Sequence, residues 1–166
     1  MACTDIFSAA GTTLHIAPLA NFPATLDKTG WEAVTGWLEI GEISGLGDYG
    51  AEAALVTHKG LDGVVCKAKG SVNYGSMTVN MALVPEDTGQ VLLRTAAGGT
   101  DKGTYPFKIT YADDTATLDN PSVDYFGAIA MSFKKQPGGD ADSIVMGMCQ
   151  LEVNTAITSV DRFETP

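Results

Sequence analysis

The sequence predicts a mainly β protein, a β-sandwich or half-barrel with one flanking α-helix at about residues 86–97. Three observations lead to this fold class. Segments in which apolar and polar residues alternate recur along the chain, and this period of two is typical of half-buried strands. Glycine is frequent, at 19 of 166 residues, which suits a chain that turns often. A full set of helix signals occurs in one short segment only.

The helix is predicted from its two ends. Asp87, followed three residues later by Gln90, has capping-box spacing, in which each side chain satisfies a backbone N–H that the first turn leaves free. The apolar flank that follows consists of Val91, Leu92, Leu93 and Ala96. Gly98 and Gly99 then predict a left-handed stop.

Most of the remaining chain favours extended structure. The expected strands cover residues 37–43, 64–69, 72–84, 105–111, 123–134 and 143–157. We expect Gly70 to break the strand pair formed by residues 64–69 and 72–84. Residues 136–142 contain Pro137-Gly138-Gly139 and predict a hairpin turn between the last two strands.

The connections and the two ends complete one expected domain over residues 1–166. Residues 44–63 are predicted to form a long Gly-rich loop, in which residues 51–58 fit either a strand or two helical turns. Prolines interrupt residues 1–30, so we expect a loose N-terminal arm or an irregular edge there. Residues 159–166 are expected to form a loose C-terminal tail.

The charge of the chain excludes one class of function. Its formal net charge is -10, whereas proteins that grip nucleic acid depend on lysine and arginine. Charged residues make up only 18%, below the roughly 25% of an ordinary domain. A surface with so few charges is expected to be covered, most simply by other copies of the same chain.

The cysteines indicate a reducing compartment. The chain has three, Cys3, Cys66 and Cys149, without CxxC spacing, so we expect free thiols. Cys66 and Cys149 lie in apolar stretches and are predicted to be small core residues. No stretch approaches the ~20 apolar residues of a membrane span. Because Asp5 stands where a basic leader would be, we expect no secretory signal.

Residues 45–50, Gly-Leu-Gly-Asp-Tyr-Gly, match the GxGxxG pattern of dinucleotide-binding loops. That fingerprint needs a strand before it and a full helix after it. Here the chain reaches Lys59-Gly60 without a helix signal, and Asp48 would place a negative charge beside the pyrophosphate. We therefore interpret the segment as a flexible glycine loop and expect no cofactor.

Other candidate sites have structural explanations. His15 and His58 lie too far apart in the sequence to signal a clustered metal site. A loose acidic cluster lacks the 12-residue spacing and terminal Glu of an EF-hand and fits a solvated turn. Its members are Asp113, Asp114, Asp119 and Asp124. No serine or cysteine has a nucleophile motif, so the sequence predicts no metal, no catalytic residue and no enzyme.

In the order of its elements and in several short phrases, the chain resembles a tail tube protein (major tail protein) of long-tailed bacteriophages. The phrases are LEIGEISGLGDY (residues 38–49), THKGLD (57–62), YGSMTVNM (74–81), DTGQVLL (87–93) and YFGAIAMS (125–132). The resemblance extends from about Trp31 to Ile157. Contractile-tail tubes, gene-transfer particles and secretion-system tubes share this architecture, and the sequence leaves the choice among them open.

The resemblance implies a structural subunit that self-assembles into hexameric rings, stacked as a hollow tube through which DNA reaches the host cell. It implies four kinds of partner: other copies of itself, a tape measure protein, a tail terminator and baseplate or tail-tip proteins. The expected location is the virion tail, assembled in the bacterial host cytoplasm. In relatives the arms and the long loop between early strands mediate ring stacking. The corresponding stacking-loop candidates are Gly45, Gly47, Asp48, Tyr49, Glu52 and Asp62.

A tube that conducts DNA should have a neutral or acidic inner wall, because inward lysines and arginines would pair with phosphates. The polar phases of residues 72–84 and 123–134 are nearly free of basic residues. The resulting lumen-facing candidates are Tyr74, Ser76, Thr78, Asn80 and Asp124. Lys67, Lys69 and Lys108 should instead face neighbouring subunits or the exterior.

Two alternatives from other functional classes remain open at this stage. One is a monomeric β-sandwich module that binds a small ligand through the loop of residues 45–50. The other is a hydrolase whose site carries no recognisable motif. The oligomeric state separates the tube subunit from the ligand-binding module.

Overall fold

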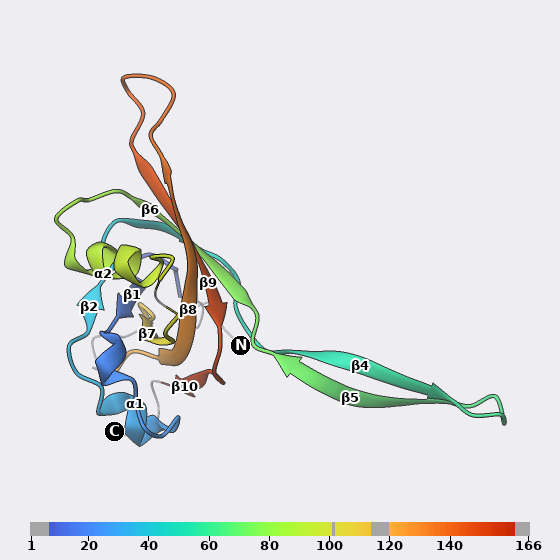
Figure 1. Cartoon of the computed structure of the whole chain (residues 1–166). Coiled ribbons are helices and arrows are strands. Elements are labelled where there is room, and N and C mark those ends of the chain that lie inside the picture. The colour runs from blue at the N-terminus through green and yellow to red at the C-terminus, as the bar shows by residue number, and fades with distance from the viewer. Residues whose placement is uncertain (1–6, 101, 114–119, 162–166) are drawn as a thin grey trace.

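A computed structural model describes residues 7–100, 102–113 and 120–161 of the chain. Its main element is an eight-stranded antiparallel sheet of order β2-β1-β7-β8-β9-β6-β3, in which β10 also pairs with β8 (Figure 1). Its strands are β1 (Thr13–Ile16), β2 (Leu38–Glu39), β3 (Ile43–Leu46), β6 (Ser76–Ala82), β7 (Tyr105–Thr110), β8 (Val123–Gln136), β9 (Met146–Val153) and β10 (Thr158–Val160). A second, two-stranded sheet consists of β4 (Glu52–Lys59) and β5 (Val65–Asn73). The helices are η2 (Leu19–Asn21), α1 (Lys28–Glu32) and α2 (Thr88–Ala96).

The main core lies between the eight-stranded sheet and α2. Leu14 of β1, Met77 of β6, Phe126 of β8 and Leu93 of α2 all have 0% exposure. Fully burying an apolar side chain of this size stabilises the fold by about 1.5–3 kcal/mol. The predicted mainly β fold with a flanking helix is confirmed, with one main sheet covered by α2 rather than two packed sheets.

α2 begins where the sequence predicts. Asp87 is its N-cap, and the Asp87 carboxylate accepts a hydrogen bond from the N–H of Gln90 at 2.7 Å. Gln90 does not return this bond, and instead its buried side chain contacts the neighbouring strands. The Gln90 amide donates to the carbonyls of Gly41 and Ala82 at 3.0 and 2.9 Å, and its oxygen accepts from Val84 N–H at 3.1 Å. Gln90 therefore fixes the helix to the sheet edge.

The predicted left-handed stop at Gly98 and Gly99 is wrong. The cap residue is Ala97, in right-handed conformation at φ -79° and ψ 0°. Its N–H donates to the carbonyl of Leu93, so the last turn closes on itself and needs no left-handed residue.

A smaller core cluster consists of Ala17, Trp31, Val34 and Tyr125. The rings of Trp31 and Tyr125 stack with centroids 6.1 Å apart and an interplanar angle of 15°. Trp31 is presented by the short helix α1, whose N-cap Asp27 accepts from Gly30 N–H at 2.8 Å. This helix was not predicted, since a five-residue helix shows too few residues for a periodic pattern.

The loose N-terminal arm predicted over residues 1–30 is wrong for most of that span. β1 is an inner strand, paired with β2 on one side and β7 on the other, and Leu14 and Ile16 are fully buried. The prolines that suggested an irregular segment lie after this strand, around the 3-10 turn η2. Residues 1–6 lie outside the described part of the chain.

The last strands follow the prediction with shifted ends. β8 and β9 pair across the expected turn, which extends from residue 137 to residue 145. β9 is shorter than the predicted strand of residues 143–157 because Ile144 and Val145 are exposed, at 71% and 42%. Ser159 and Val160, expected in a loose tail, pair with β8 as part of β10, whereas residues 162–166 lie outside the described chain.

The long loop predicted over residues 44–63 is wrong. Residues 43–46 form the edge strand β3, and Glu52–Lys59 forms β4, which settles the choice between strand and helical turns. β4 pairs with β5 to form a long two-stranded ribbon that projects from the body (Figure 1). Nor do residues 64–69 and 72–84 form a strand pair, since β5 runs through Gly70 and β6 pairs with β3 and β9.

Candidate functional site

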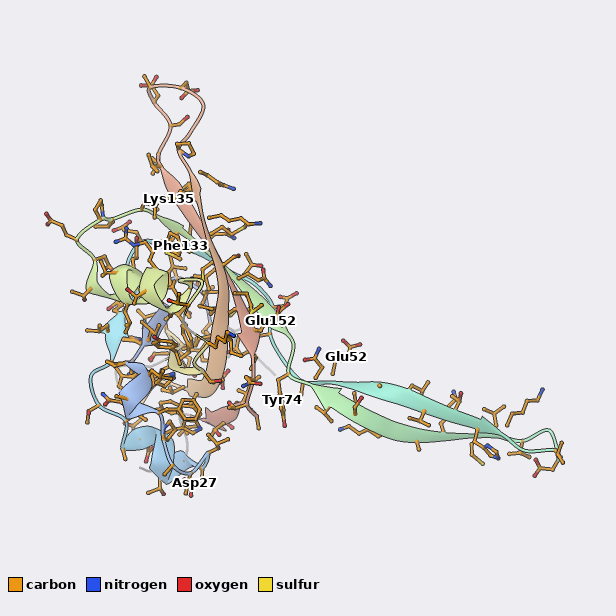
Figure 2. All side chains as sticks on the ribbon, viewed as in Figure 1. Asp27, Glu52, Tyr74, Phe133, Lys135 and Glu152 are labelled. Atoms are coloured by element: carbon orange, nitrogen blue, oxygen red, sulfur yellow. The ribbon has the colours of Figure 1, made fainter. Side chains whose placement is uncertain are left out.

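The projecting ribbon of residues 52–73, here called the β-arm, exposes nearly all of its side chains (Figure 2). Leu61 at its tip is 110% exposed, and Leu55 is 65% exposed. The other exposed large apolar residues of the segment are Val56, Val64, Val65 and Val72. Apolar side chains grouped on a projecting element, with little of the body near them, mark an interaction surface.

The register of β4 and β5 gives the β-arm two chemically different faces. Directly opposed residues of an antiparallel pair share a face, and successive residues alternate between faces. The pairs Leu55–Lys69, Thr57–Lys67 and Lys59–Val65 therefore form one face, here called the lysine face. The opposite face carries Val56–Ala68 and His58–Cys66. All three lysines of the β-arm lie on one face, interleaved with apolar side chains.

Glycines permit the close contacts that shape the β-arm. A Cβ on Gly70 would lie 2.8 Å from Val56 and 3.0 Å from the carbonyl of Ala54, beside the register shift in β4. At the base, Gly75 has φ +80°, and a Cβ there would lie 2.9 Å from the carbonyl of Gly50. The two chain crossings into the β-arm are therefore in contact at its base (Figure 1).

A cleft of about 990 Å³ opens beside the base of the β-arm. Its lining combines apolar and aromatic side chains with two acids, Asp48 and Asp124, and contains no lysine, arginine or histidine. The lining residues are Phe7, Ala9, Thr12, Leu46, Gly47, Asp48, Tyr49, Ala51, Tyr74, Ile109, Tyr111, Asp124, Ala156, Ile157 and Ser159. Tyr74 leaves the β-arm on one side of this cleft (Figure 2).

Three polar side chains form a hydrogen-bonded group in the cleft. The hydroxyls of Tyr49 and Tyr111 both donate to the Asp124 carboxylate, the second at 2.7 Å, and the two hydroxyls also contact each other. Burial, followed by the bond to Asp124, raises the pKa of Tyr49. Burial raises the pKa of Tyr111 to about 12. Both hydroxyls therefore stay protonated at neutral pH and hold the carboxylate in place.

This group links the entry of the β-arm to the body. Tyr49 lies in the segment that leads into β4, whereas Tyr111 follows β7 and Asp124 belongs to β8. The Tyr49 ring also stacks on Phe126 of the core, with centroids 5.6 Å apart. The base of the β-arm is thus fixed to the core through one side chain.

A second surface is the open side of β6 and β9, away from the main core. Cross-strand pairing places Ser76 opposite Glu152 and Thr78 opposite Gln150, and Thr78 donates to Gln150 at 2.9 Å. Asn80 lies opposite Met148 and is exposed. This open sheet face, defined by Ser76, Thr78, Asn80, Met148, Gln150 and Glu152, is polar and weakly charged.

The lumen-facing candidates do not lie on one surface. Ser76, Thr78 and Asn80 share the open sheet face. Asp124 lies opposite Ile109, a core residue, so it lies on the other face of the sheet, in the cleft. Tyr74 also lines the cleft, because the turn at Gly75 interrupts the alternation that would have aligned it with Ser76.

The stacking-loop candidates divide between the cleft and the β-arm. Gly47, Asp48 and Tyr49 line the cleft, and Gly45 lies in β3 at the edge of the main sheet. Glu52 begins the β-arm and Asp62 lies at its tip. Sequence reasoning missed Tyr111, whose pairing with Tyr49 spans 62 residues and leaves no local signal. Lys108 packs 5.1 Å over the ring of Trp37 in the same chain.

The two described cysteines differ in their surroundings. Cys149 is fully buried, as predicted, and burial raises the pKa of its thiol to about 12. The prediction that Cys66 is a core residue is wrong, because Cys66 is exposed on the β-arm. Cys66 and Cys149 are both free thiols, and Cys3 lies outside the described residues.

Two searches concern residues 7–100, 102–113 and 120–161 only. Within these ranges, no group of three or more His, Cys, Asp or Glu side chains is placed to hold a metal ion. Across the same part of the chain, no helix has the length and apolar character to cross a membrane.

The fold is that of tube components of tails and injection systems. The chain is similar to the PVC sheath/tube terminator of an extracellular contractile injection system, with a TM-score of 0.68, 10% identity, and coverage of 96% of this chain and 99% of that one. It is similar to a chain of the anti-feeding prophage baseplate, with a TM-score of 0.63, 12% identity, and coverage of 99% and 100%. It is also similar to the SPP1 tail tube, with a TM-score of 0.60, 12% identity, and coverage of 93% and 78%.

These likenesses confirm, at the level of fold, the resemblance to tail tube proteins that the sequence indicated. No protein-family profile matches the chain. No curated protein sequence matches it at a significant level.

Proposed function

We propose that the chain is a structural, non-enzymatic subunit that self-assembles into hexameric rings, stacked as the hollow tube of a phage tail. The observation that carries this proposal is the β-arm. It projects from the body, exposes apolar side chains and lysines, and finds no comparable surface in its own chain to cover them. A second copy is the simplest partner for such an element.

The structural likenesses support a ring-based assembly. The solved structures of the same fold include a sheath–tube complex, a tube terminator and a tail tube. The baseplate structure that contains one of them was described as six-fold symmetrised. Six copies per ring is the symmetry we propose for this chain.

The open sheet face is the surface that we propose for the wall of the channel. Ser76, Thr78 and Asn80 offer hydrogen-bonding groups without positive charge, and Glu152 adds a negative one. DNA would pass such a wall without being held, since phosphate binding depends on lysine and arginine. Tyr74 and Asp124, which line the cleft, are not part of this proposed wall.

Other tail proteins complete the proposed assembly. We infer contacts with a tape measure protein inside the tube, a terminator at one end, and baseplate or tail-tip proteins at the other. The terminator, cap and baseplate chains of similar fold support the last two. The proposed location is the virion tail, after assembly in the bacterial host cytoplasm.

Size-exclusion chromatography and negative-stain microscopy of the purified chain test the proposal. The expected result is hollow, six-fold tubes that lengthen with protein concentration. A chain that stays monomeric at high concentration, with and without its β-arm, would contradict it.

The cleft supports a second candidate, the monomeric ligand-binding module. Its volume of about 990 Å³ lies at the upper end of the roughly 300–1,000 Å³ range of small-molecule pockets. Three residues of the 45–50 segment line it: Gly47, Asp48 and Tyr49. Saturable binding of a small apolar cation by the monomer, with no tubes formed, would favour this candidate over the tube subunit.

A further inference from the structure

We propose that the cleft is the receptor for the β-arm of a second copy, which enters with its lysine face toward Asp48 and Asp124. This inference rests on the proposed tube function, because it names the surface against which a stacking element docks. It assigns a role to the cleft and an orientation to the β-arm.

The β-arm cannot occupy the cleft of its own chain. Its strands are hydrogen-bonded to each other and lead away from the body (Figure 1). At about 3.3 Å per residue, the eight residues of β4 carry the tip roughly 26 Å from the base. The cleft lies at that base, lined by Ala51 and Tyr74 on either side of the β-arm. A β-arm that fills it must come from another molecule.

The charges of donor and receptor are complementary. The chain as a whole carries a net charge of -10, yet the β-arm has three lysines against two acids, Glu52 and Asp62. The cleft has two acids and no basic residue in its lining. Complementary potentials steer association and fix the register of the contact. The positive element of one copy therefore favours the acidic cleft of another.

The apolar parts of the two surfaces also match. On the lysine face, Leu55 lies opposite Lys69 and Val65 lies opposite Lys59. The cleft offers apolar lining to such side chains from Leu46, Tyr74, Ile109 and Ile157. Lysine stems pack along apolar surface while their ammonium groups reach acidic groups. The opposite face of the β-arm has no charged partner to offer, since it carries Val56–Ala68 and His58–Cys66.

The Tyr49–Tyr111–Asp124 group gives the receptor a fixed acidic point. Two tyrosyl hydroxyls hold one carboxylate oxygen of Asp124, and both stay protonated because burial raises their pKa values. Asp48, in contrast, is exposed at the rim. An incoming lysine meets one positioned carboxylate inside the cleft and one free carboxylate at its edge.

A photo-cross-linking experiment on the full chain tests the orientation. p-Benzoylphenylalanine is placed at Thr57, on the lysine face, or at Ala68, on the opposite face, and the assembled protein is irradiated and mapped by mass spectrometry. The probe at Thr57 is expected to cross-link to residues of the cleft in another copy, such as 46–51, 109–111 or 156–159. The probe at Ala68 is expected to miss these peptides.

A charge-swap experiment tests the ion pairs. Asp48→Lys and Lys67→Glu are each expected to raise the protein concentration needed for assembly by about tenfold, because each places like charges together. The double variant is expected to recover most of this loss. Lys135→Glu, on β8 and away from the β-arm (Figure 2), is the matched control and should behave as the parent chain.

The outcomes distinguish this inference from the tube proposal. Tubes that form while the Thr57 probe cross-links to the open sheet face, or to any surface other than the cleft, overturn the receptor and leave the tube intact. A double variant no better than its single variants also overturns it. A chain that neither assembles nor gives an intermolecular cross-link at high concentration overturns both.

Discussion

The eight-stranded body and the β-arm are both antiparallel β-structure, but their side chains have different surroundings. In β9 of the body, buried and half-buried residues alternate without exception. In β4 of the β-arm, seven of eight residues are exposed and none is buried. An isolated two-stranded hairpin is marginally stable in water, because it has no second layer to cover its apolar side chains. The comparison teaches that the body is stabilised by its own core, whereas the β-arm obtains its covering layer from another copy.

Excising the β-arm should separate the two regions completely. Gly50 and Gly75 are in contact at its base, so a short Gly-Ser linker can replace residues 51–74 without stretching the body. We expect an unchanged core and total loss of assembly. Thermal unfolding followed by circular dichroism, with negative-stain microscopy of the same sample, measures both. An excised chain that still forms tubes would show that the β-arm is dispensable.

The two described thiols should report the same contrast by chemistry. In a Cys3→Ser variant at neutral pH, a maleimide is expected to modify Cys66 at least about a hundredfold faster than Cys149, because thiolate access controls the rate. Burial keeps Cys149 protonated, with its pKa raised to about 12. Intact-mass measurement should show one label on the native chain and two after denaturation. Assembly should slow the labelling of Cys66, and equal rates for the two thiols would refute the contrast.

One substitution made in both regions should have opposite consequences. Leu93→Ala removes a fully buried side chain of α2 and should lower the free energy of unfolding by about 2–5 kcal/mol. Leu61→Ala removes a fully exposed side chain and should leave that free energy within about 0.5 kcal/mol, while weakening assembly. Urea unfolding of the unassembled chain measures both values. A large loss of stability from Leu61→Ala would mean that the tip packs against its own body.

The histidines should give the smallest effect. Burial and the nearby Lys108 lower the pKa of His15 from 6.5, so the folded state disfavours its protonated form. The unfolded chain takes up this proton first as the pH falls below about 6.5, and the contribution of neutral His15 to stability is lost as the pH falls further through the lowered pKa. His15→Gln should therefore flatten the pH dependence of urea unfolding below pH 6.5. His58→Gln, on the exposed β-arm, should leave that dependence unchanged.

The elements of the body could be predicted from the sequence because their side chains alternate against one core. The strand at residues 76–82 and the helix after Asp87 both follow this rule. The β-arm could not be separated from the core by the same signal, because its apolar residues alternate in the same way but pack on nothing in the chain. Cys66 was placed in the core for this reason.

The cleft was beyond prediction for a different reason. Asp124 meets Tyr49 across 75 residues of sequence, and neither residue type nor spacing signals that contact. Gly70 was predicted as a strand break, since nothing in the sequence shows that Val56 and the Ala54 carbonyl would lie where a Cβ would otherwise be. The flanking phrases indicated the family fold, yet the position of individual side chains depended on long-range packing.

The presence of the β-arm and the cleft on one chain has a consequence for the ends of a stack. A contact between two different surfaces extends in one direction without closing on itself, unless rotation brings it round into a ring. A finished stack would therefore have polarity, with unfilled clefts at one end and free β-arms at the other. A protein that stops growth at the first end must present an arm, and one that starts growth at the second must present a cleft. Terminator and baseplate chains of this same fold have the architecture to do either.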